Sequence, residues 1–122
     1  MQQDNKTQNQ LKTGTIHESF DRNILTLTMS NHTKKNAINY EMYSALSQAL
    51  DEAAINQEVH VVILTGEGSA FTSGNDVNAF ETRNTASIEP PSSIVFLKSL
   101  ATFPKPIIAK VNGVAIGIGS TM

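Results

Sequence analysis

The sequence contains no cysteine and no tryptophan, and only 16% of its 122 residues are charged. Without cysteine the chain has no disulfide, no thiolate metal ligand and no thiol nucleophile, which excludes redox and zinc-finger functions. The same absence suits a reducing compartment, and we expect a cytoplasmic protein. Nine basic residues against eleven acidic ones give a net charge of −2, so the basic surface typical of nucleic-acid-binding proteins is missing. We therefore expect no nucleic-acid partner.

The sequence also lacks a long hydrophobic run. The longest apolar stretch, residues 107–122, is interrupted by Lys110 and Asn112 and is shorter than the roughly 20 residues of a membrane span. Half of residues 1–12 are glutamine or asparagine, so this segment is interpreted as a polar, disordered tail rather than a signal peptide. With 39% hydrophobic residues, the rest of the chain can form a packed core. We predict a soluble protein with no membrane partner and one domain over residues 13–122.

Four segments have the composition of β-strands. Residues 15–20 and 23–29 are rich in Ile, Leu, Thr and Phe and predict a hairpin around the turn Asp21-Arg22. Residues 60–65 and 107–112 contain nearly unbroken apolar runs, which are typical of strands buried on both faces.

Two segments have the spacing of helices. Asn39 is a good N-cap, and the residues after it follow the i, i+3, i+4, i+7 pattern of one helical face, so we predict a helix near 40–55. A second helix is expected from Ile94 to the region before Pro104, which would stop it. The apolar face of the first helix consists of Met42, Leu46, Ala49, Leu50 and Ala53.

The segments between these elements are polar or rich in glycine and proline. Asp76 could cap a short helix that begins near Val77. Residues 83–93 contain two prolines and many Ser and Thr residues, and are interpreted as a flexible surface connection. Residues 113–122 resemble a turn that leads into a further helix. The alternation of strands with helices predicts an α/β fold.

Common ligand-binding motifs are absent. Gly117-Ile118-Gly119 would need a glycine at position 122 to complete a dinucleotide fingerprint, and that residue is Met122. The chain has neither the Gly-x-x-x-x-Gly-Lys phosphate loop nor a Gly-x-Ser-x-Gly nucleophile elbow. Its histidines, at positions 17, 32 and 60, are scattered over separate segments, so no metal site is expected.

Two glycine-rich strand ends remain, in residues 66–76 and 113–119. Each follows an apolar strand and precedes an expected helix. Because the first N–H groups of a helix have no partner within it, two such ends facing each other could present two donors to one oxygen atom. That arrangement is an oxyanion hole. The alternative is that the glycines only permit tight turns and close packing, and the spacing leaves both interpretations open.

The same two ends resemble a known family. Ala70-Phe71-Thr72-Ser73-Gly74-Asn75-Asp76 is similar to the Phe-x-Ser/Ala-Gly-x-Asp segment of the crotonase (enoyl-CoA hydratase/isomerase) superfamily. Residues 105–117, Lys-Pro-Ile-Ile-Ala-Lys-Val-Asn-Gly-Val-Ala-Ile-Gly, are similar to its Lys-Pro-x-Ile-Ala-x-Val-Asn-Gly-x-Ala-x-Gly segment. Residues 31–46, with Lys35-Asn36-Ala37-Ile38, resemble its early Asn-Ala-Leu segment. The resemblance covers about residues 13–122.

This resemblance implies a spiral of ββα units, incomplete in 122 residues, and a trimer or hexamer of the full-length protein. It implies an acyl-CoA substrate and no separate cofactor, since coenzyme A is part of the substrate. The backbone N–H groups of Asn75 and Ile118 would form the oxyanion hole. The implied substrate-binding residues are Lys34, Lys35, Ala37, Phe71, Ser73, Gly74, Asp76, Val77, Asn78 and Gly117. For the two lysines, contact with a CoA phosphate competes with an ordinary solvated loop charge.

Departures from the family pattern favour one of its reactions. Hydratases of the superfamily have a catalytic Glu where this chain has Thr121, and no acidic residue follows Glu89. The Ala-Ile-Gly-Ile-Gly-Ser-Thr run is more similar to the Δ3,Δ2-enoyl-CoA isomerase branch, in which a single later carboxylate moves the proton. We therefore expect part of an enoyl-CoA isomerase, with the base beyond residue 122 and the chain inactive on its own. An enoyl-CoA hydratase and a non-catalytic acyl-CoA-binding or interaction module stay open as alternatives.

Overall fold

The computed structural model describes residues 14–74 and 91–116. The predicted tail over 1–12, the predicted cap at Asp76 and most of the predicted connection over 83–93 lie outside these residues. The tail and the cap are therefore untested, and the connection is tested only at its end.

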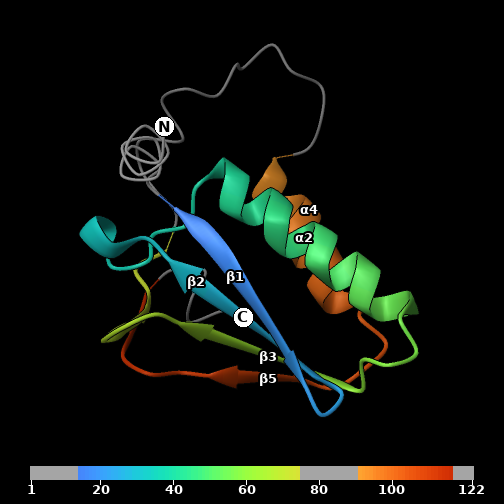
Figure 1. The fold of residues 1–122 in the computed structure, drawn as a ribbon. Helices are drawn as coiled ribbons and strands as arrows, with labels where there is room; N and C mark the ends of the chain where they lie inside the picture. Colours follow the sequence, from blue (N-terminus) through green and yellow to red (C-terminus); the bar gives the residue numbers. More distant parts are fainter. Residues whose placement is uncertain (1–13, 75–90, 117–122) are drawn as a thin grey trace, which may run out of the picture.

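A four-stranded sheet and two helices form the main body of the described chain. The strands are β1 (Thr15–Asp21), β2 (Ile24–Ser30), β3 (Val61–Gly66) and β5 (Ile107–Lys110), in the spatial order β1-β2-β3-β5. The first pair is antiparallel, and the other two pairs are parallel. Helices α2 (Tyr40–Ile55) and α4 (Ser92–Ala101) lie side by side over one face of this sheet (Figure 1).

The β1–β2 hairpin and helix α2 confirm the local predictions. Asp21 pairs with Ile24, so the turn residues are Arg22 and Asn23, one position later than expected. Both have positive φ, 53° and 68°, as a two-residue hairpin turn requires. The side chain of Asn39 caps α2 by accepting a hydrogen bond from the Met42 N–H at 2.9 Å. All five predicted apolar residues of α2 are buried in the core against the sheet.

The prediction of strands buried on both faces is wrong. In β3, Val62 and Leu64 are buried under the helices, whereas Val61 and Ile63, on the other face, are only half-buried. Strand β5 lies at the edge of the sheet in the described chain, and its Ile108 side chain is 52% exposed. An apolar run shows that a strand can be buried, but the neighbouring elements decide which face is covered.

Three short elements were not predicted. They are the 3-10 turn η1 (His32–Lys34) and the strands β4 (Ala70–Thr72) and β6 (Val114–Ala115), which pair in parallel as a second, two-stranded sheet. Residues 113–116 therefore contain a strand, not the turn and helix start that we expected there. Helix α4 begins at Ser92, so the predicted connection over 83–93 was too long at its end.

Candidate functional site

Strands β4 and β6 bring the two glycine-rich segments together. Ala70 pairs with Val114 and Thr72 with Ala115, and the backbone N–H of Ile116 donates to the carbonyl oxygen of Thr72 at 3.1 Å. This confirms the prediction that the chain after β3 and the chain after β5 meet. Asn75 and Ile118, the predicted oxyanion donors, follow these paired residues within three positions but lie outside the described residues.

Glycine is required at two positions where these segments approach backbone groups closely. A Cβ atom on Gly113 would overlap the carbonyl oxygen of Ser69, and a Cβ atom on Gly66 would overlap the carbonyl oxygens of Ala70 and Phe71. The prediction that glycines here permit tight turns and close packing is therefore confirmed at Gly66 and Gly113. The close approach they permit is also what allows β4 and β6 to pair beside each other.

The loop 31–38 supports the segment that ends at Gly74. The Ser73 N–H donates to the Lys35 carbonyl at 2.9 Å, and the Ser73 hydroxyl donates to the Lys34 carbonyl at 2.7 Å. The Ile38 N–H donates to the Gly74 carbonyl at 2.8 Å. The loop turns tightly enough for these contacts because Lys35 has a φ of 51° and the next residue one of 59°, both left-handed.

Thr72 fixes the last turn before the predicted donor at Asn75. Its side chain is fully buried, and its hydroxyl donates to the Asn36 carbonyl at 2.6 Å. The same hydroxyl oxygen accepts a hydrogen bond from the Gly74 N–H at 3.1 Å. Gly74 has a φ of 96°, a conformation that favours glycine. The buried Thr72 hydroxyl therefore fixes the backbone conformation at Gly74.

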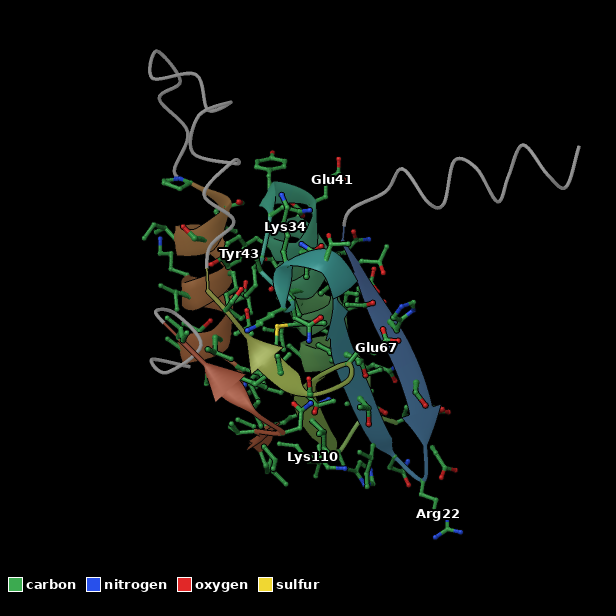
Figure 2. All side chains as sticks on the ribbon, turned by 90° about the vertical axis from the view of Figure 1, so that its left-hand side faces the viewer. Arg22, Lys34, Glu41, Tyr43, Glu67 and Lys110 are labelled. Atoms are coloured by element: carbon green, nitrogen blue, oxygen red, sulfur yellow. The ribbon has the colours of Figure 1, made fainter. Side chains whose placement is uncertain are left out.

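The predicted substrate-binding residues within the described chain surround this segment. Phe71 is fully buried in the core, so only its main chain can face a ligand. Ala37 and Gly74 are buried, Ser73 is half-buried, and Lys35 is exposed. Lys34 lies on the η1 turn that follows β2, far from Arg22 at the opposite end of the hairpin (Figure 2). The structure thus brings these residues together. Asp76, Val77, Asn78 and Gly117 lie outside the described residues.

Two asparagines that the sequence did not single out bind the same turn. The side chains of Asn36 and Asn112 both donate to the carbonyl oxygen of Ala70, at 2.9 and 3.2 Å. Both residues stand in the motif segments quoted above. Motif position alone, however, does not say which carbonyl group a side-chain amide meets.

Among the residues that the structure describes, one ionisable group has a clearly displaced pKa, and it lies in the core. Burial raises the pKa of Tyr43 to about 12, because the phenolate would lose its hydration there. Its ring packs against Phe96 of α4, with centroids 5.7 Å apart. Tyr43 therefore joins the two helices.

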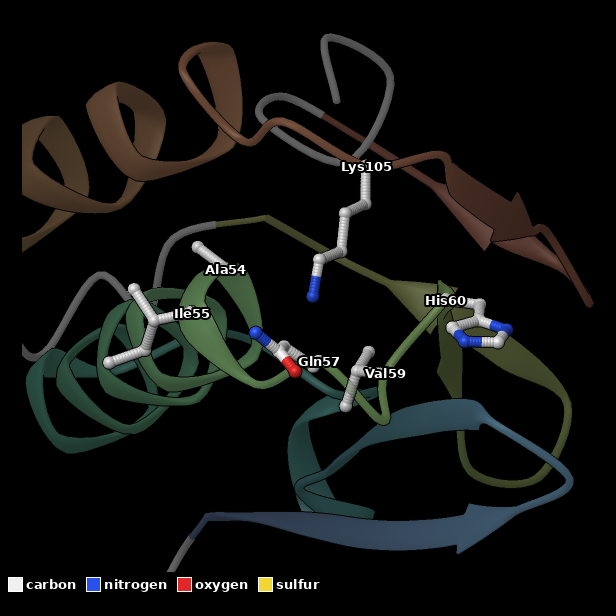
Figure 3. A pocket seen from close by; sticks show the side chains of 6 residues that line it. All are labelled: Ala54, Ile55, Gln57, Val59, His60 and Lys105. Atoms are coloured by element: carbon white, nitrogen blue, oxygen red, sulfur yellow. The ribbon is translucent and has the colours of Figure 1, made fainter.

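A cavity of about 450 Å³ lies elsewhere on the protein (Figure 3). Its walls are Ala54, Ile55, Gln57, Val59, His60 and Lys105. Val59 and His60 precede β3, whereas the candidate site follows the other end of that strand. The Lys105 ammonium group donates to the carbonyls of Ala53 and Asn56, at 2.6 Å each, and so caps the C-terminal end of α2. This cavity is therefore separate from the candidate site.

Comparison with known proteins agrees with the sequence motifs. A family profile described as enoyl-CoA hydratase/isomerase matches residues 19–122. The chain is 35% identical over 104 residues to enoyl-CoA delta isomerase 3, peroxisomal, of Mus musculus, which covers 81% of this chain and 32% of that protein. It is 31% identical over 107 residues to a probable enoyl-CoA hydratase of Mycobacterium tuberculosis, covering 83% of this chain and 40% of that protein.

The fold is also found among solved structures. The crystal structure of an enoyl-CoA hydratase/isomerase from Pseudoalteromonas atlantica T6c superposes with a TM-score of 0.81 and 36% identity, covering 90% of this chain and 43% of that one. This agreement confirms the predicted fold class. The chain spans less than half the length of each of these relatives.

Residues 14–74 and 91–116 contain neither a candidate membrane span nor a candidate metal site. None of the helices described there is both long and apolar enough to cross a membrane. Within the same ranges, no three His, Asp or Glu side chains gather where they could hold a metal ion.

Proposed function

Because this chain belongs to the enoyl-CoA hydratase/isomerase family, the crotonase superfamily, and corresponds to its N-terminal region, we propose that it forms the acyl-CoA-binding part of an enoyl-CoA isomerase. The parallel pairing of β4 with β6 carries this proposal, since it aligns the two segments that lead to Asn75 and Ile118. Two backbone N–H groups at these positions would point at one thioester oxygen.

The proposed chemistry is stabilisation of an enolate. Removal of a proton from C2 of a 3-enoyl thioester places negative charge on the thioester oxygen, and return of a proton at C4 completes the double-bond shift. Two N–H donors held about 2.7–3.1 Å from that oxygen stabilise the charge, at about 10²–10³-fold in rate for each donor. The buried Thr72 hydroxyl and Gly74 hold the backbone before the first donor. In this site coenzyme A is part of the substrate.

Isomerisation is favoured over hydration by two features. Thr121 stands where the hydratases of the superfamily have a catalytic Glu. Among the relatives, the mouse protein is an enoyl-CoA delta isomerase by name. The chain is also 31% identical to the probable enoyl-CoA hydratase of M. tuberculosis, so hydration is the alternative reaction to be tested.

An assay of the 122-residue chain with a 3-enoyl-CoA and a 2-enoyl-CoA tests this proposal. We expect both thioesters to bind saturably in calorimetry. We expect little or no turnover, because catalysis also needs a positioned base, which contributes about 10²–10⁴-fold in rate. Failure to bind either thioester contradicts the proposal. Hydration of the 2-enoyl-CoA without isomerisation of the 3-enoyl-CoA would assign the hydratase reaction instead.

A non-catalytic acyl-CoA-binding or interaction module is the second candidate. It is favoured by the residue at position 121, where Thr stands in place of the carboxylate that the hydratases of the superfamily use. A chain extended with the C-terminal region of a relative distinguishes the two candidates: an isomerase gains turnover with the additional residues, whereas a binding module gains none. Light scattering on that extended chain tests the proposed homotrimer or hexamer.

A further inference from the structure

Asn36 connects the loop 31–38 to the turn between β3 and β4. Its side chain is almost fully buried, with 2% of the residue exposed. Its Nδ2 group donates to the carbonyls of Glu67 and Ala70 at 2.9 Å each, and its Oδ1 atom accepts from the Asn31 N–H at 2.9 Å. The donors and the acceptor of this amide are thus all used, and each partner is a main-chain group.

Asn112 connects the end of β5 to the same turn from the other side. Its Nδ2 group lies 2.8 Å from the Gly66 carbonyl, 2.7 Å from the Gly68 carbonyl and 3.2 Å from that of Ala70. Its Oδ1 atom accepts from the Gly66 N–H at 3.2 Å. The amide therefore pairs with both main-chain groups of Gly66, as a neighbouring strand would.

The turn needs donors that the sheet cannot supply. The carbonyl groups of Gly66, Glu67 and Ala70 are bonded to these amides in buried or partly buried positions, and a buried carbonyl without a hydrogen bond is costly. An Asn side chain offers two N–H donors and one acceptor on a short stem, which fits this demand. Asn36 contacts the chain where β4 begins, at Ala70. Asn112 directly precedes Gly113 and β6 in the sequence.

We propose that Asn36 and Asn112 act together as positioning residues, which hold the turn 66–70 so that the ends of β4 and β6 stay in register at the oxyanion site. Their common bond to the Ala70 carbonyl is the link between the two segments. The positioning role rests on the proposed function, whereas the register itself does not. This positioning role requires no contact between either side chain and the substrate.

Single Asn→Asp variants test the pair, because they keep the shape of the side chain and replace its NH₂ group by oxygen. At pH 8 an ionised carboxylate would face two or three carbonyl oxygens and donate to none, whereas the acid form, which those oxygens favour and which pH 5 promotes, can donate once. Asn23→Asp is the matched control: Asn23 Nδ2 donates to the Glu58 carbonyl at 2.8 Å, at the exposed hairpin turn.

The main readout is hydrogen exchange of the Ile116 N–H, which is bonded to Thr72. We expect N36D and N112D to lower its protection factor at pH 8 by about tenfold or more, with recovery at pH 5, while amides in β2 and β3 change less than about twofold. The second readout is calorimetric affinity for butanoyl-CoA, which should fall about tenfold at pH 8 and recover at pH 5. N23D should change neither.

Unchanged protection of Ile116 in both variants, or an equal loss over all strands, overturns the proposal. If an Asp variant does not fold at pH 8, N112S replaces it: its hydroxyl keeps one donor, so protection of Ile116 should fall at pH 5 and pH 8 alike, and no fall contradicts the register role. If the unaltered chain binds no butanoyl-CoA, the proposed function fails, and the exchange of Ile116 still decides whether the two asparagines hold the register.

Discussion

The backbone N–H of Ile116 donates to the carbonyl oxygen of Thr72 at 3.1 Å, across 44 residues of chain. This bond lies at the described end of both segments that resemble the crotonase motifs. Everything that holds it is main chain or is bonded to main chain: the Thr72 hydroxyl, the Asn36 and Asn112 amides, and two glycines that allow close approach. A site made of backbone N–H groups depends on such support, because side-chain identity cannot correct a misplaced backbone.

Thr72→Val should destabilise the protein by about 1–3 kcal/mol. The valine would keep the buried volume but leave the Asn36 carbonyl and the Gly74 N–H without their partner. Thr26→Val, on the half-buried face of β2, is the control and should change stability by less than about 0.5 kcal/mol. Urea unfolding measures both variants. Equal effects of the two substitutions would show that the Thr72 hydroxyl has no special role.

Gly66→Ala and Gly68→Ala separate two reasons for glycine in the same turn. The added methyl group at Gly66 would collide with two carbonyl oxygens, so we expect a loss of about 3 kcal/mol or more. Gly68 has a φ of 78° but open space around it, so Gly68→Ala should cost only the roughly 1 kcal/mol of a left-handed alanine. Thermal unfolding compares the two. A smaller loss for Gly66→Ala than for Gly68→Ala contradicts the close packing.

Tyr43 makes stability fall at high pH. Its pKa is raised to about 12 in the folded protein, so between about pH 10 and pH 12 the folded state holds a proton that the unfolded state has lost. The contribution is complete below pH 10 and decreases by up to about 1.4 kcal/mol per pH unit above it. Denaturant unfolding of Tyr43→Phe should lack this part of the slope, while Tyr40→Phe, at a site 65% exposed, should keep it. Identical slopes for the Tyr43→Phe variant and the unaltered chain would contradict the assignment.

The elements predicted well were those whose signal is local. Helix α2 has a capping Asn39 and a continuous apolar face, and the hairpin has two adjacent strands with a polar turn. Each pattern lies within about 16 consecutive residues, so periodicity is enough to find it. The resemblance to the family motifs also predicted that the two glycine-rich strand ends meet. Local patterns alone do not predict this contact.

The features that escaped prediction depend on distant partners. Strands β4 and β6 have three and two residues, too few for any periodicity, and exist because they pair with each other. The contact of Asn112 with Ala70 spans 42 positions, and the sequence does not show which carbonyl groups will lack a donor. The exposure of Ile108 was missed for a related reason: composition does not identify the strand at the edge of a sheet.

We propose that Asn75 and Ile118 present their backbone N–H groups to one thioester oxygen, and amide NMR of the labelled 122-residue chain can observe this contact at both residues. Titration with butanoyl-CoA should move both amide protons downfield together and saturably, whereas free coenzyme A, which lacks the thioester carbonyl, should leave these two protons in place. Saturable binding of butanoyl-CoA with neither proton displaced, or with shifts confined to the cavity around Val59, His60 and Lys105, would contradict the account.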